Sequence, residues 1–466
     1  MKIYKMYVLL VFLFLSPVSI MAQEIITINP LIKNQSFKGW GVSLSWWAND
    51  VGNTFSDESL NLFCKWLTDP QELNMNVFRY NISGGDAPGH SHMRKDTQIQ
   101  GYKNNENESY NWSNDSAQRR ILLKVHQMCP DGIYEAANYS PPFWMTKSGC
   151  TAGDSNGLDN LKDDYYDDFT RYLVDCVKHY KVKYGITFST ISPVNEPFSN
   201  WWKINGTQEG CAFSQSNQER IVRELHKELK SRKMLSYTGI SMMDANSIDE
   251  CLKGVKGYEK EGILPLIKQI NVHSYAGDKR TELNEIVKKN KLMLWQSESG
   301  PLEVKEKGFD NFLFMAKRII TDMRDLKPDV WCDWQYMGAE FGSVWALVGY
   351  NVNTKAYERT KGFYCRKQFS HFIKKGYTVI ESDNPNTLTA QSPDGKTMVI
   401  VIVNPELVNK SYILKINREK FKTINSYRTS ENEDFVTIAQ NNTFNAKALA
   451  VELKNKSITT IILNKN

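Results

Sequence analysis

The segment that decides the fold is Phe188-Ser189-Thr190-Ile191-Ser192-Pro193-Val194-Asn195-Glu196-Pro197, a strand-like apolar run that closes on a single carboxylate. A second segment, Leu292-Met293-Leu294-Trp295-Gln296-Ser297-Glu298-Ser299-Gly300, has the same design. A buried parallel strand ends where its apolar run ends, so Glu196 and Glu298 should both lie at the carboxyl ends of strands. These ends are where α/β barrels carry their chemistry. The two segments therefore predict two carboxylates that face each other at one end of a barrel.

The rest of residues 37–375 supports a barrel, because strand-like runs alternate with segments of helical periodicity. The strand candidates are 40–46, 77–82, 133–139, 188–194, 236–242, 269–273, 292–296 and 330–336. They are largely apolar rather than alternating, as parallel strands buried on both faces are. Between them, Phe169, Leu173, Cys176 and Tyr180 fall on one stripe of an amphipathic helix. Eight βα repeats predict an α/β fold, a (β/α)8 TIM barrel.

Residues 376–466 follow a different pattern, in which short β-rich runs are separated by Asn, Asp, Gly and Ser. The runs are 387–391, 398–404, 412–416, 435–439, 448–453 and 458–463. This spacing predicts a small antiparallel β-sandwich as a side domain. A further strand-like run at 24–29, within residues 23–36, precedes the barrel repeat. We expect this N-terminal strand to pair with the side domain.

Residues 1–22 have the pattern of a secretory signal peptide. Lys2 and Lys5 supply positive charge, residues 8–15 an apolar centre, and Ala22 a small residue before a cleavage point at Gln23. The apolar centre is too short for a membrane span. The sequence therefore predicts a secreted or periplasmic protein without a transmembrane segment.

The amino-acid composition limits the kinds of molecule that the protein is expected to bind. The formal net charge of +6 is spread thinly, and no basic stripe of the kind that binds nucleic acid is present. Aromatic residues make up 12% of the chain, including twelve Trp, and sugar sites use such flat apolar faces. We expect a polysaccharide or oligosaccharide as the partner of a monomeric protein, with no nucleic acid.

The eight cysteines allow disulfides in an exported chain, but they are scattered. Cys176 lies on an apolar helix stripe and is expected to act as a small hydrophobe, whereas Cys150 and Cys211 form the loop pair to test for a bond. No Cys-x-x-Cys or His-Glu-x-x-His motif is present, so neither a metal nor another cofactor is expected. The close pair His90 and His92 is expected to be solvent-exposed rather than ligating.

Polar and aromatic residues follow most of the predicted strands. In chain order they are Trp46 and Trp47, Arg79 and Asp86, Trp144, Asn195 and Glu196, His273 and Tyr275, Glu298, and Trp334. Cleavage of a glycosidic bond needs two carboxyl groups, one to donate a proton and one to attack or stabilise the anomeric carbon. The pattern therefore favours a glycoside hydrolase.

These motifs resemble glycoside hydrolase family 30. The matching segments are Gly39-Trp40-Gly41, Arg79, Ser140-Pro141-Pro142-Phe143-Trp144-Met145, Asn195-Glu196-Pro197, His273-Ser274-Tyr275 and Ser297-Glu298-Ser299. The resemblance implies a retaining enzyme with Glu196 as the acid/base and Glu298 as the nucleophile. Arg79 would keep the nucleophile ionised, Tyr275 would orient it, and Asn195 would bind the sugar 2-OH. The expected substrate-binding residues are Trp46, Trp47, Arg79, Asp86, Trp144, Asn195, Trp202, His273, Tyr275 and Trp334.

The choice of substrate rests on a narrower resemblance. The Trp46-Trp47 pair and the segment Asn81-Ile82-Ser83-Gly84-Gly85-Asp86-Ala87-Pro88-Gly89-His90 are similar to the endo-β-1,6-galactanase branch. Asp86 or Gln335 would then read the galactose O4. A β-1,6-glucanase or a xylanase of the same family stays open, and Arg359 is the loop cation that a xylanase would need. Two functions of other classes also stay open, namely a non-catalytic carbohydrate-binding barrel and a metal-dependent hydrolase.

Overall fold

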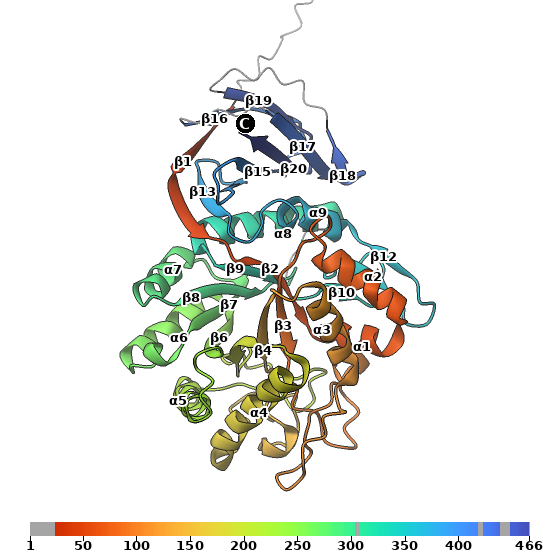
Figure 1. The fold of residues 1–466 in the computed structure, drawn as a ribbon, viewed down its shortest axis with the longest axis vertical. Helices are drawn as coiled ribbons and strands as arrows, with labels where there is room; N and C mark the ends of the chain where they lie inside the picture. The colour runs from red at the N-terminus through yellow and green to blue at the C-terminus, as the bar shows by residue number, and fades with distance from the viewer. Residues whose placement is uncertain (1–23, 303–304, 306, 418–422, 439–447, 466) are drawn as a thin grey trace, which may run out of the picture.

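A closed barrel and a large curved sheet make up the computed structural model of the chain (Figure 1). The structure describes residues 24–302, 305, 307–417, 423–438 and 448–465. The expected signal peptide and the expected new N-terminus at Gln23 lie outside the described residues.

The barrel contains eight parallel strands, which confirms the predicted (β/α)8 architecture. They are β2 (Gly39–Leu44), β3 (Val77–Asn81), β4 (Ile133–Ala137), β5 (Phe188–Ser192), β6 (Gly239–Ser247), β7 (Gln269–Ala276), β8 (Met293–Glu298) and β9 (Val330–Asp333). Each strand pairs with the next, and β9 pairs in parallel with β2, so the barrel closes. Each predicted strand overlaps one observed strand. All eight carboxyl ends therefore open toward the same end of the barrel.

One strand differs from its predicted bounds in a way that matters for the site. The predicted strand ends at Met242, but β6 continues through Met243, Asp244, Ala245 and Asn246 to Ser247. Its register with β7 shifts near Met243 and again after Ala245. Met243 and Asp244 both have left-handed backbone angles, with φ of 86° and 40°. This irregularity turns the Asp244 side chain into the barrel, where it is fully buried.

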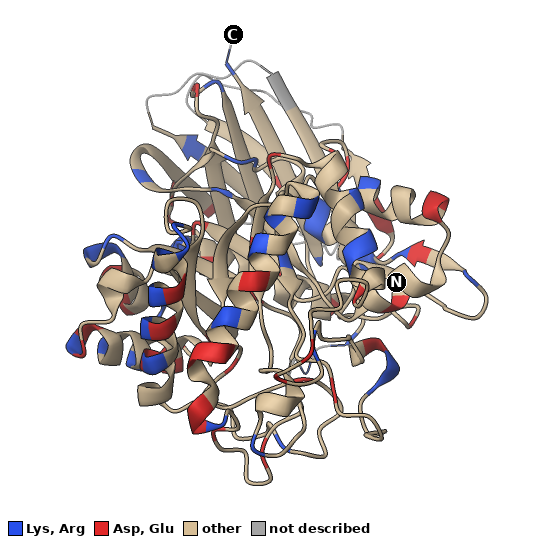
Figure 2. Cartoon of the chain, turned by 60° about the horizontal axis from the view of Figure 1, so that its bottom comes forward, with Lys and Arg blue, Asp and Glu red and all other residues tan. Residues whose placement is uncertain are grey.

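Helices surround the barrel strands. They are α1 (Trp47–Thr54), α2 (Asp57–Thr68), α3 (Ser116–Met128), α4 (Tyr166–Tyr184), α5 (Gln215–Ser231), α6 (Ile248–Lys260), α7 (Arg280–Lys289), α8 (Phe309–Thr321), which continues as a π-helix at Asp322–Leu326, and α9 (Lys361–Ser370). The Ser56 side chain caps α2 by accepting from the Ser59 N–H at 3.3 Å. The predicted stripe of α4 is buried. Charged residues of both signs are mixed along the outer helices (Figure 2). No helix among the described residues has the length and hydrophobicity needed to cross a bilayer.

The loops at the open end of the barrel contain three short 3-10 helical segments and a small sheet. The sheet consists of β10 (Met337–Gly338), β11 (Val348–Tyr350) and β12 (Tyr357–Arg359), and it lies between β9 and α9 along the chain. The segments are Lys95–Thr97, Phe143–Met145 and Asp163–Tyr165. A fourth, Leu264–Leu266, leads from α6 toward β7. The loops after β3, β4, β5 and β9 supply most of the walls of the pocket at this end.

Among the described residues, the side domain is one continuous nine-stranded sheet, in the order β18-β17-β20-β15-β14-β13-β1-β16-β19. Its strands are β1 (Glu24–Ser36), β13 (Thr378–Ser382), β14 (Thr387–Gln391), β15 (Thr397–Asn404), β16 (Lys410–Ile416), β17 (Thr423–Ser430), β18 (Glu433–Thr437), β19 (Ala448–Leu453) and β20 (Ser457–Asn464). The pairings are antiparallel except that of β1 with β16, which is parallel. The N-terminal strand therefore lies inside the C-terminal sheet.

Both faces of the central strands in this sheet are buried. In β15, Met398, Ile400 and Ile402 belong to the core of the side domain, together with residues of β1, β16 and β19. The alternate residues Val399 and Val401 belong to the core shared with the barrel. Helices α8 and α9 lie between the barrel strands and this sheet (Figure 1). The side domain is thus joined to the barrel through a common apolar core.

All eight cysteines are described, and all are free thiols. The structure therefore contains no bond between Cys150 and Cys211, the pair singled out in the sequence. Cys176 is fully buried on its helix stripe, as expected for a small hydrophobe. Burial raises the pKa of Cys150 to about 11 and that of Cys211 to about 12.

Candidate active site

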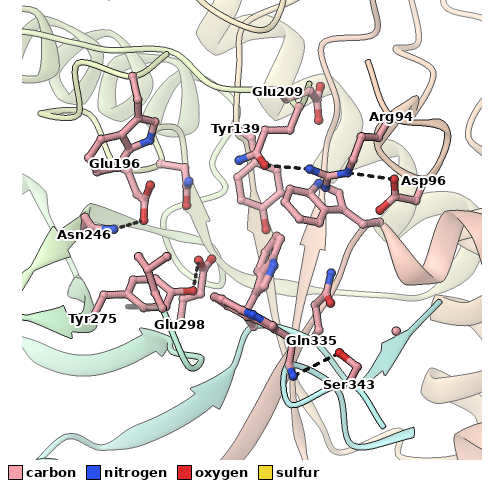
Figure 3. Close-up of a pocket in the computed structure, with 18 of the residues that line it drawn as sticks. Arg94, Asp96, Tyr139, Glu196, Glu209, Asn246, Tyr275, Glu298, Gln335 and Ser343 are labelled. Carbon is pink, nitrogen blue, oxygen red and sulfur yellow. Dashed lines mark hydrogen bonds and ion pairs between the residues drawn. The ribbon is translucent and has the colours of Figure 1, made fainter. Parts of the chain in front are cut away.

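The two carboxyl groups that the sequence singles out meet at the open end of the barrel. Glu298 is the last residue of β8, and Glu196 follows β5 by four residues. Their side chains point into one pocket (Figure 3). Coordinating atoms of Glu196, Glu298 and His273 all lie within 4.8 Å of one another. Both carboxylates are more than nine-tenths buried.

The position of Glu196 depends on an unusual backbone. Its φ is 45°, a left-handed conformation that costs a non-glycine residue on the order of 1–3 kcal/mol. Its N–H donates to the Asp244 carbonyl at 2.8 Å, and its own carbonyl accepts from Trp202 Nε1 at 3.0 Å. The irregular stretch of β6 therefore holds the turn that presents Glu196.

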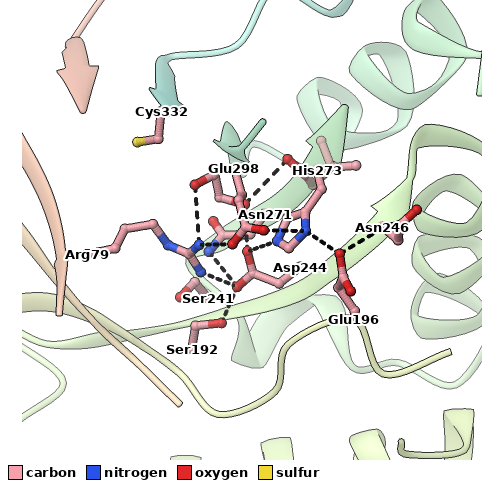
Figure 4. Close-up of polar contacts among 12 residues, drawn as sticks. Arg79, Ser192, Glu196, Ser241, Asp244, Asn246, Asn271, His273, Glu298 and Cys332 are labelled. Carbon is pink, nitrogen blue, oxygen red and sulfur yellow. Dashed lines mark hydrogen bonds and ion pairs between the residues drawn. The ribbon is translucent and has the colours of Figure 1, made fainter. Parts of the chain in front are cut away.

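A buried ionic network lies beneath the two carboxylates (Figure 4). Arg79 on β3 donates to Glu135 Oε1 and to Asp244 Oδ2, each at 2.8 Å, and its Nη1 lies 3.6 Å from Glu298 Oε2. The Asn271 amide bridges Glu135 and Asp244 at 2.9 and 3.0 Å. Burial opposes ionisation of Asp244, but Arg79 and His273 lower the pKa of its carboxyl well below the usual range. Arg79 is thus a fixed cation with two structural counterions and the more distant Glu298.

His273 on β7 connects this network to both carboxylates. Its Nδ1 lies 3.0 Å from Glu196 Oε1 and 3.5 Å from Glu298 Oε1, while Nε2 lies 3.3 Å from Asp244 Oδ1. Burial alone would favour the neutral ring, but the carboxylates of Glu298, Asp244 and Glu196 raise the pKa of His273 to about 10. The ring is therefore an imidazolium near neutral pH, and both of its nitrogens are donors. Glu196, His273 and Glu298 thus form one buried cluster of ion pairs.

The electrostatic surroundings favour one shared proton on the carboxyl pair. Burial raises the pKa of Glu298 to about 7, an effect that the Glu196 carboxylate strengthens and that His273, Arg79 and Tyr275 oppose. When two acids lie this close, the proton belongs to the pair. Below about pH 7 the pair therefore holds a proton, which a mechanism with one acid and one carboxylate requires.

Hydrogen bonds orient the two carboxylates differently. The Tyr275 hydroxyl donates to Glu298 Oε1 at 3.0 Å, and the Asn246 amide donates to Glu196 Oε1 at 2.7 Å. The Oδ1 atom of Asn195, next to Glu196, is buried and has no partner within the described residues. An amide oxygen of this kind is available to a sugar hydroxyl.

The pocket above the carboxylates has a volume of about 780 Å³. Seven aromatic residues line it, namely Trp46, Tyr139, Trp201, Trp202, Tyr275, Trp334 and Trp345. Polar lining residues include Arg94, Asp96, Asn195, Gln208, Glu209, Asn246, Gln335, Glu340 and Ser343. A concave site with aromatic walls and a few polar groups suits a carbohydrate.

Trp46 stands at a strained turn in this wall. It has φ of 48°, packs edge-on against Trp334 at 4.7 Å, and carries the Arg94 guanidinium over its ring at 4.5 Å. Trp334 and Trp202 are largely buried but border the pocket, and half of the Trp201 surface is exposed. Arg79 and His273 lie beneath the pocket floor and contact the carboxylates from below.

Three residues expected to bind substrate do not line this pocket. Trp47 starts α1 and is buried, with Nε1 donating to the Ser43 carbonyl at 2.8 Å. Trp144 donates to the Lys103 carbonyl at 3.1 Å and packs against Tyr165. Asp86 borders a separate hollow, where its carboxylate contacts His90. Each is close in sequence to a barrel strand end, but the following loop or helix turns its side chain away from the pocket.

Arg359, considered as a cation for a xylanase, also lies outside the pocket. Its guanidinium pairs with Glu72 at 2.6 Å and stacks on the rings of Trp66 and Phe363. These contacts give it a structural role on the outside of the barrel.

Sequence reasoning missed several residues of the site. Asp244 and Asn246 lie on the irregular, polar end of β6, where neither period nor hydrophobicity marks a strand. Glu135 is a charged residue within a buried strand, and a lone charge in an apolar run was the available signal. Glu209 comes from a long loop, and burial raises its pKa to about 7 although Ser83, Asn81 and the Gly84 N–H bond to it.

Comparisons with known proteins identify the family to which the chain belongs. The sequence profile described as O-Glycosyl hydrolase family 30 matches residues 23–261, just over half of the chain. An endo-beta-1,6-galactanase of Hypocrea rufa is 28% identical over 408 residues, which cover 82% of this chain and 81% of that protein. An exo-beta-1,6-galactobiohydrolase of Bifidobacterium longum subsp. longum is 24% identical over 541 aligned residues, covering 84% of this chain and 35% of that protein.

The architecture is also similar to that of solved structures. The catalytic domain of the GH30 xylanase C from Talaromyces cellulolyticus superposes with a TM-score of 0.75 at 17% identity. The match covers 95% of this chain and all of the other. A similarity at this low identity shows the fold, a barrel with its side sheet. The substrate has to be inferred from the residues of the pocket.

Proposed function

Because the chain belongs to O-glycosyl hydrolase family 30, we propose that it is a retaining hydrolase that cleaves β-1,6-linked galactan within the chain. The observation that carries the retaining mechanism is the separation of Glu196 and Glu298. Their nearest coordinating atoms lie within 4.8 Å. Retaining enzymes hold their carboxyl groups about 5–5.5 Å apart, whereas inverting enzymes leave about 6.5–9.5 Å for a water molecule.

The two residues have different tasks in this mechanism. The Glu298 carboxylate attacks the anomeric carbon while Glu196 gives its proton to the glycosidic oxygen, so the C–O bond breaks and a glycosyl ester forms. Glu196 then takes a proton from water, the water oxygen attacks the same carbon, and Glu298 leaves as a carboxylate. Arg79, His273 and the Tyr275 hydroxyl lie beside Glu298 and favour its carboxylate form, as a nucleophile needs. The Asn246 amide orients Glu196.

The shape of the pocket supports a bent, 1,6-linked substrate. A 1,6 linkage passes through a flexible CH2 group, so the chain turns and fits walls on several sides better than a long flat groove. Trp46, Trp201 and Trp334 provide such walls, and galactose has an axial O4 that leaves one ring face more apolar. Since Asp86 lies elsewhere, Gln335 is the remaining candidate of the two to read O4. A site that hydrogen-bonds this hydroxyl would discriminate strongly against glucose.

The similarity to the Hypocrea rufa endo-beta-1,6-galactanase, which the alignment covers over most of its length, supports internal cleavage. Cleavage from a chain end, the activity of the less similar Bifidobacterium longum protein, is the second candidate. The two differ in the size of the first products, so they are separable by experiment.

The test is incubation with β-1,6-galactan and, in parallel, β-1,6-glucan. We expect the galactan to release a ladder of oligosaccharides whose new reducing ends appear first as the β-anomer in a proton NMR time course. The Glu298→Ala variant is the matched control for contaminating activity. Faster release from the glucan, a single small product from the galactan, or an α-anomer at the earliest times would overturn the substrate, the endo action or the retaining mechanism, respectively.

We also propose that the protein is exported after removal of residues 1–22. The charged start and apolar centre of that segment support this proposal. Intact-mass measurement of the exported protein should give a chain that begins at or near Gln23. A mature protein that retains Met1 would contradict it.

A further inference from the structure

A second cluster of coordinating side chains lies outside the active site, where two loops meet. Asp86, His90 and His92 belong to the loop after β3, and Cys150 belongs to the loop after β4. One coordinating atom from each of these four residues lies within 4.8 Å of all the others. The proposed hydrolase mechanism uses none of them.

The separations within this cluster are close to those around a tetrahedral zinc ion. Bond lengths of about 2.3 Å to sulfur and about 2.0 Å to nitrogen or oxygen imply ligand separations of about 3.6 Å and about 3.3 Å. His92 Nε2 lies 3.7 Å from Cys150 Sγ. His90 Nδ1 lies 2.9 Å from Asp86 Oδ1, so this pair would open by a few tenths of an ångström.

The surrounding hydrogen bonds already orient two of the ligands. His92 Nδ1 lies 2.6 Å from the Gly206 carbonyl, and because a carbonyl only accepts, this nitrogen carries the proton. The lone pair of Nε2 is therefore left to face Cys150. The Ala152 N–H donates to Cys150 Sγ at 3.3 Å, a contact that stabilises a thiolate. Bonds of this kind fix the tautomer and direction of ligands in zinc proteins.

One side of the cluster is buried among apolar residues, and the other side is exposed to solvent. Cys150 is fully buried and packs with Met93, Ala152 and Ile204 in a small apolar cluster. His90, on the other side, is exposed. An ion would therefore have an entry path past His90 and a nonpolar wall behind the sulfur.

We propose that Asp86, His90, His92 and Cys150 bind one zinc ion that fastens the two loops together. A mixed set of thiolate, imidazole and carboxylate suits zinc, whereas calcium and magnesium prefer oxygen ligands alone. Four protein ligands complete a tetrahedron and leave no position for substrate, so this zinc is structural rather than catalytic.

A zinc ion bound at this site would stabilise one wall of the substrate pocket. Gly206, which holds His92, precedes Thr207, whose carbonyl accepts the Arg94 N–H at 2.9 Å. Arg94 lines the pocket and stacks on Trp46. Loss of zinc should therefore loosen this wall and raise KM more than it lowers kcat.

The first experiment measures zinc in the full-length mature protein. After treatment with a chelator, the protein is equilibrated at a fixed free zinc concentration and its metal content is determined by mass spectrometry. We expect one zinc per chain, and we expect Co²⁺ in its place to show the charge-transfer absorption of a thiolate ligand. Less than a tenth of an equivalent of zinc in the wild type would overturn the proposal.

Variants then identify the ligands. Cys150→Ser and His90→Ala should each lose at least nine-tenths of the bound zinc, and Cys150→Ser should abolish the cobalt–thiolate band. The matched controls are Cys211→Ser, another buried loop thiol, and His226→Ala, a histidine on α5. Because His90 is exposed, its variant should fold even where Cys150→Ser does not. Full zinc content in His90→Ala, or equal loss in the controls, would contradict the assignment.

Discussion

The barrel mouth and the side sheet are both deeply buried, but they bury opposite kinds of side chain. Beneath the carboxyl ends of β3 to β8 lie Arg79, Glu135, Asp244 and His273, all essentially inaccessible to water. The core of the side sheet is instead formed by Ile, Leu, Val and Met, with one Tyr, from β1, β13, β15, β16, β19 and β20. Burial of apolar surface stabilises a fold directly, whereas buried charges stabilise it only as far as they are paired.

This difference suggests that the barrel mouth serves catalysis and the side sheet serves stability. The barrel mouth keeps charges that an apolar core would dispense with, and it adds left-handed backbone at Trp46, Glu196 and Asp244. Such costs persist where they position groups for chemistry. The side sheet has a dry core and takes in the N-terminal strand, so it ties the two ends of the described chain together. Catalysis should therefore respond to changes at the mouth, and stability to changes in the sheet.

The largest effect should come from Glu298→Ala. Removing a nucleophile costs enzymes on the order of 10⁶-fold in kcat. Burial disfavours the ionised carboxylate, so the melting temperature should stay the same or rise. Added azide should restore turnover as a glycosyl azide of inverted configuration, since a small anion fits the vacated space. A variant that keeps normal kcat, or an azide product of retained configuration, would contradict the role of Glu298.

Glu196→Ala should have the next largest effect on turnover. Loss of general acid–base catalysis costs about 10²–10⁴-fold, and the loss should be smallest for substrates whose leaving group needs no proton. Azide should accelerate the second step and give a glycosyl azide of retained configuration. An equal loss for good and poor leaving groups would argue against proton donation by Glu196.

Arg79 is both a buried ion-pair partner and a neighbour of Glu298, so its substitution should lower stability and activity together. Arg79→Met leaves Glu135 without a cation in a dry interior and Asp244 with His273 alone, which should cost about 3–5 kcal/mol of unfolding free energy. It should also abolish activity, since Glu298 loses a cation. Denaturant unfolding and kcat measure the two effects. Arg318→Met, which removes a mostly buried arginine that contacts Ser299 and Gly300, is the control. Unchanged stability in Arg79→Met would show that the network is not paired as described.

In the side sheet, Leu414→Ala should lower stability and spare the chemistry. Leu414 is fully buried in the core of the sheet, and such truncations cost about 2–5 kcal/mol. With the protein still folded, kcat should stay within about twofold of wild type, because the residue lies in the other domain. Lys415→Ala, an exposed neighbour on β16, is the control. A large fall in kcat at temperatures well below the melting transition would contradict the division between the two regions.

The parts of this architecture that follow from the sequence are those that depend on local pattern. The apolar runs around Phe188 and Met293 identify strands, and their ends locate Glu196 and Glu298. The pattern fails where tertiary structure overrides it. Asp244 lies in a strand because of an irregular register, and the neighbours Trp46 and Trp47 face opposite ways because a helix begins between them. The strands β13 and β17 are short polar-apolar mixtures that become strands by pairing in the sheet.

The smallest effect concerns the pH profile. The carboxyl pair needs one proton, so kcat/KM should fall as pH rises through about 7, the value to which burial raises the pKa of Glu298. The Tyr275 hydrogen bond stabilises the carboxylate and lowers this pKa. In Tyr275→Phe the alkaline limb should therefore move to higher pH, by less than about one unit. A shift to lower pH would mean that Tyr275 favours the protonated form.

In the proposed mechanism, the Glu298 carboxylate is the group that bonds to the sugar. An activated 2-deoxy-2-fluoro β-galactosyl substrate should form the glycosyl-enzyme faster than water can hydrolyse it, since fluorine slows both steps and the good leaving group restores the first. Mass spectrometry of the digested protein should then find the sugar on the peptide that contains Glu298. A label on Glu196, or turnover of this substrate with inversion and no labelled peptide, would contradict it.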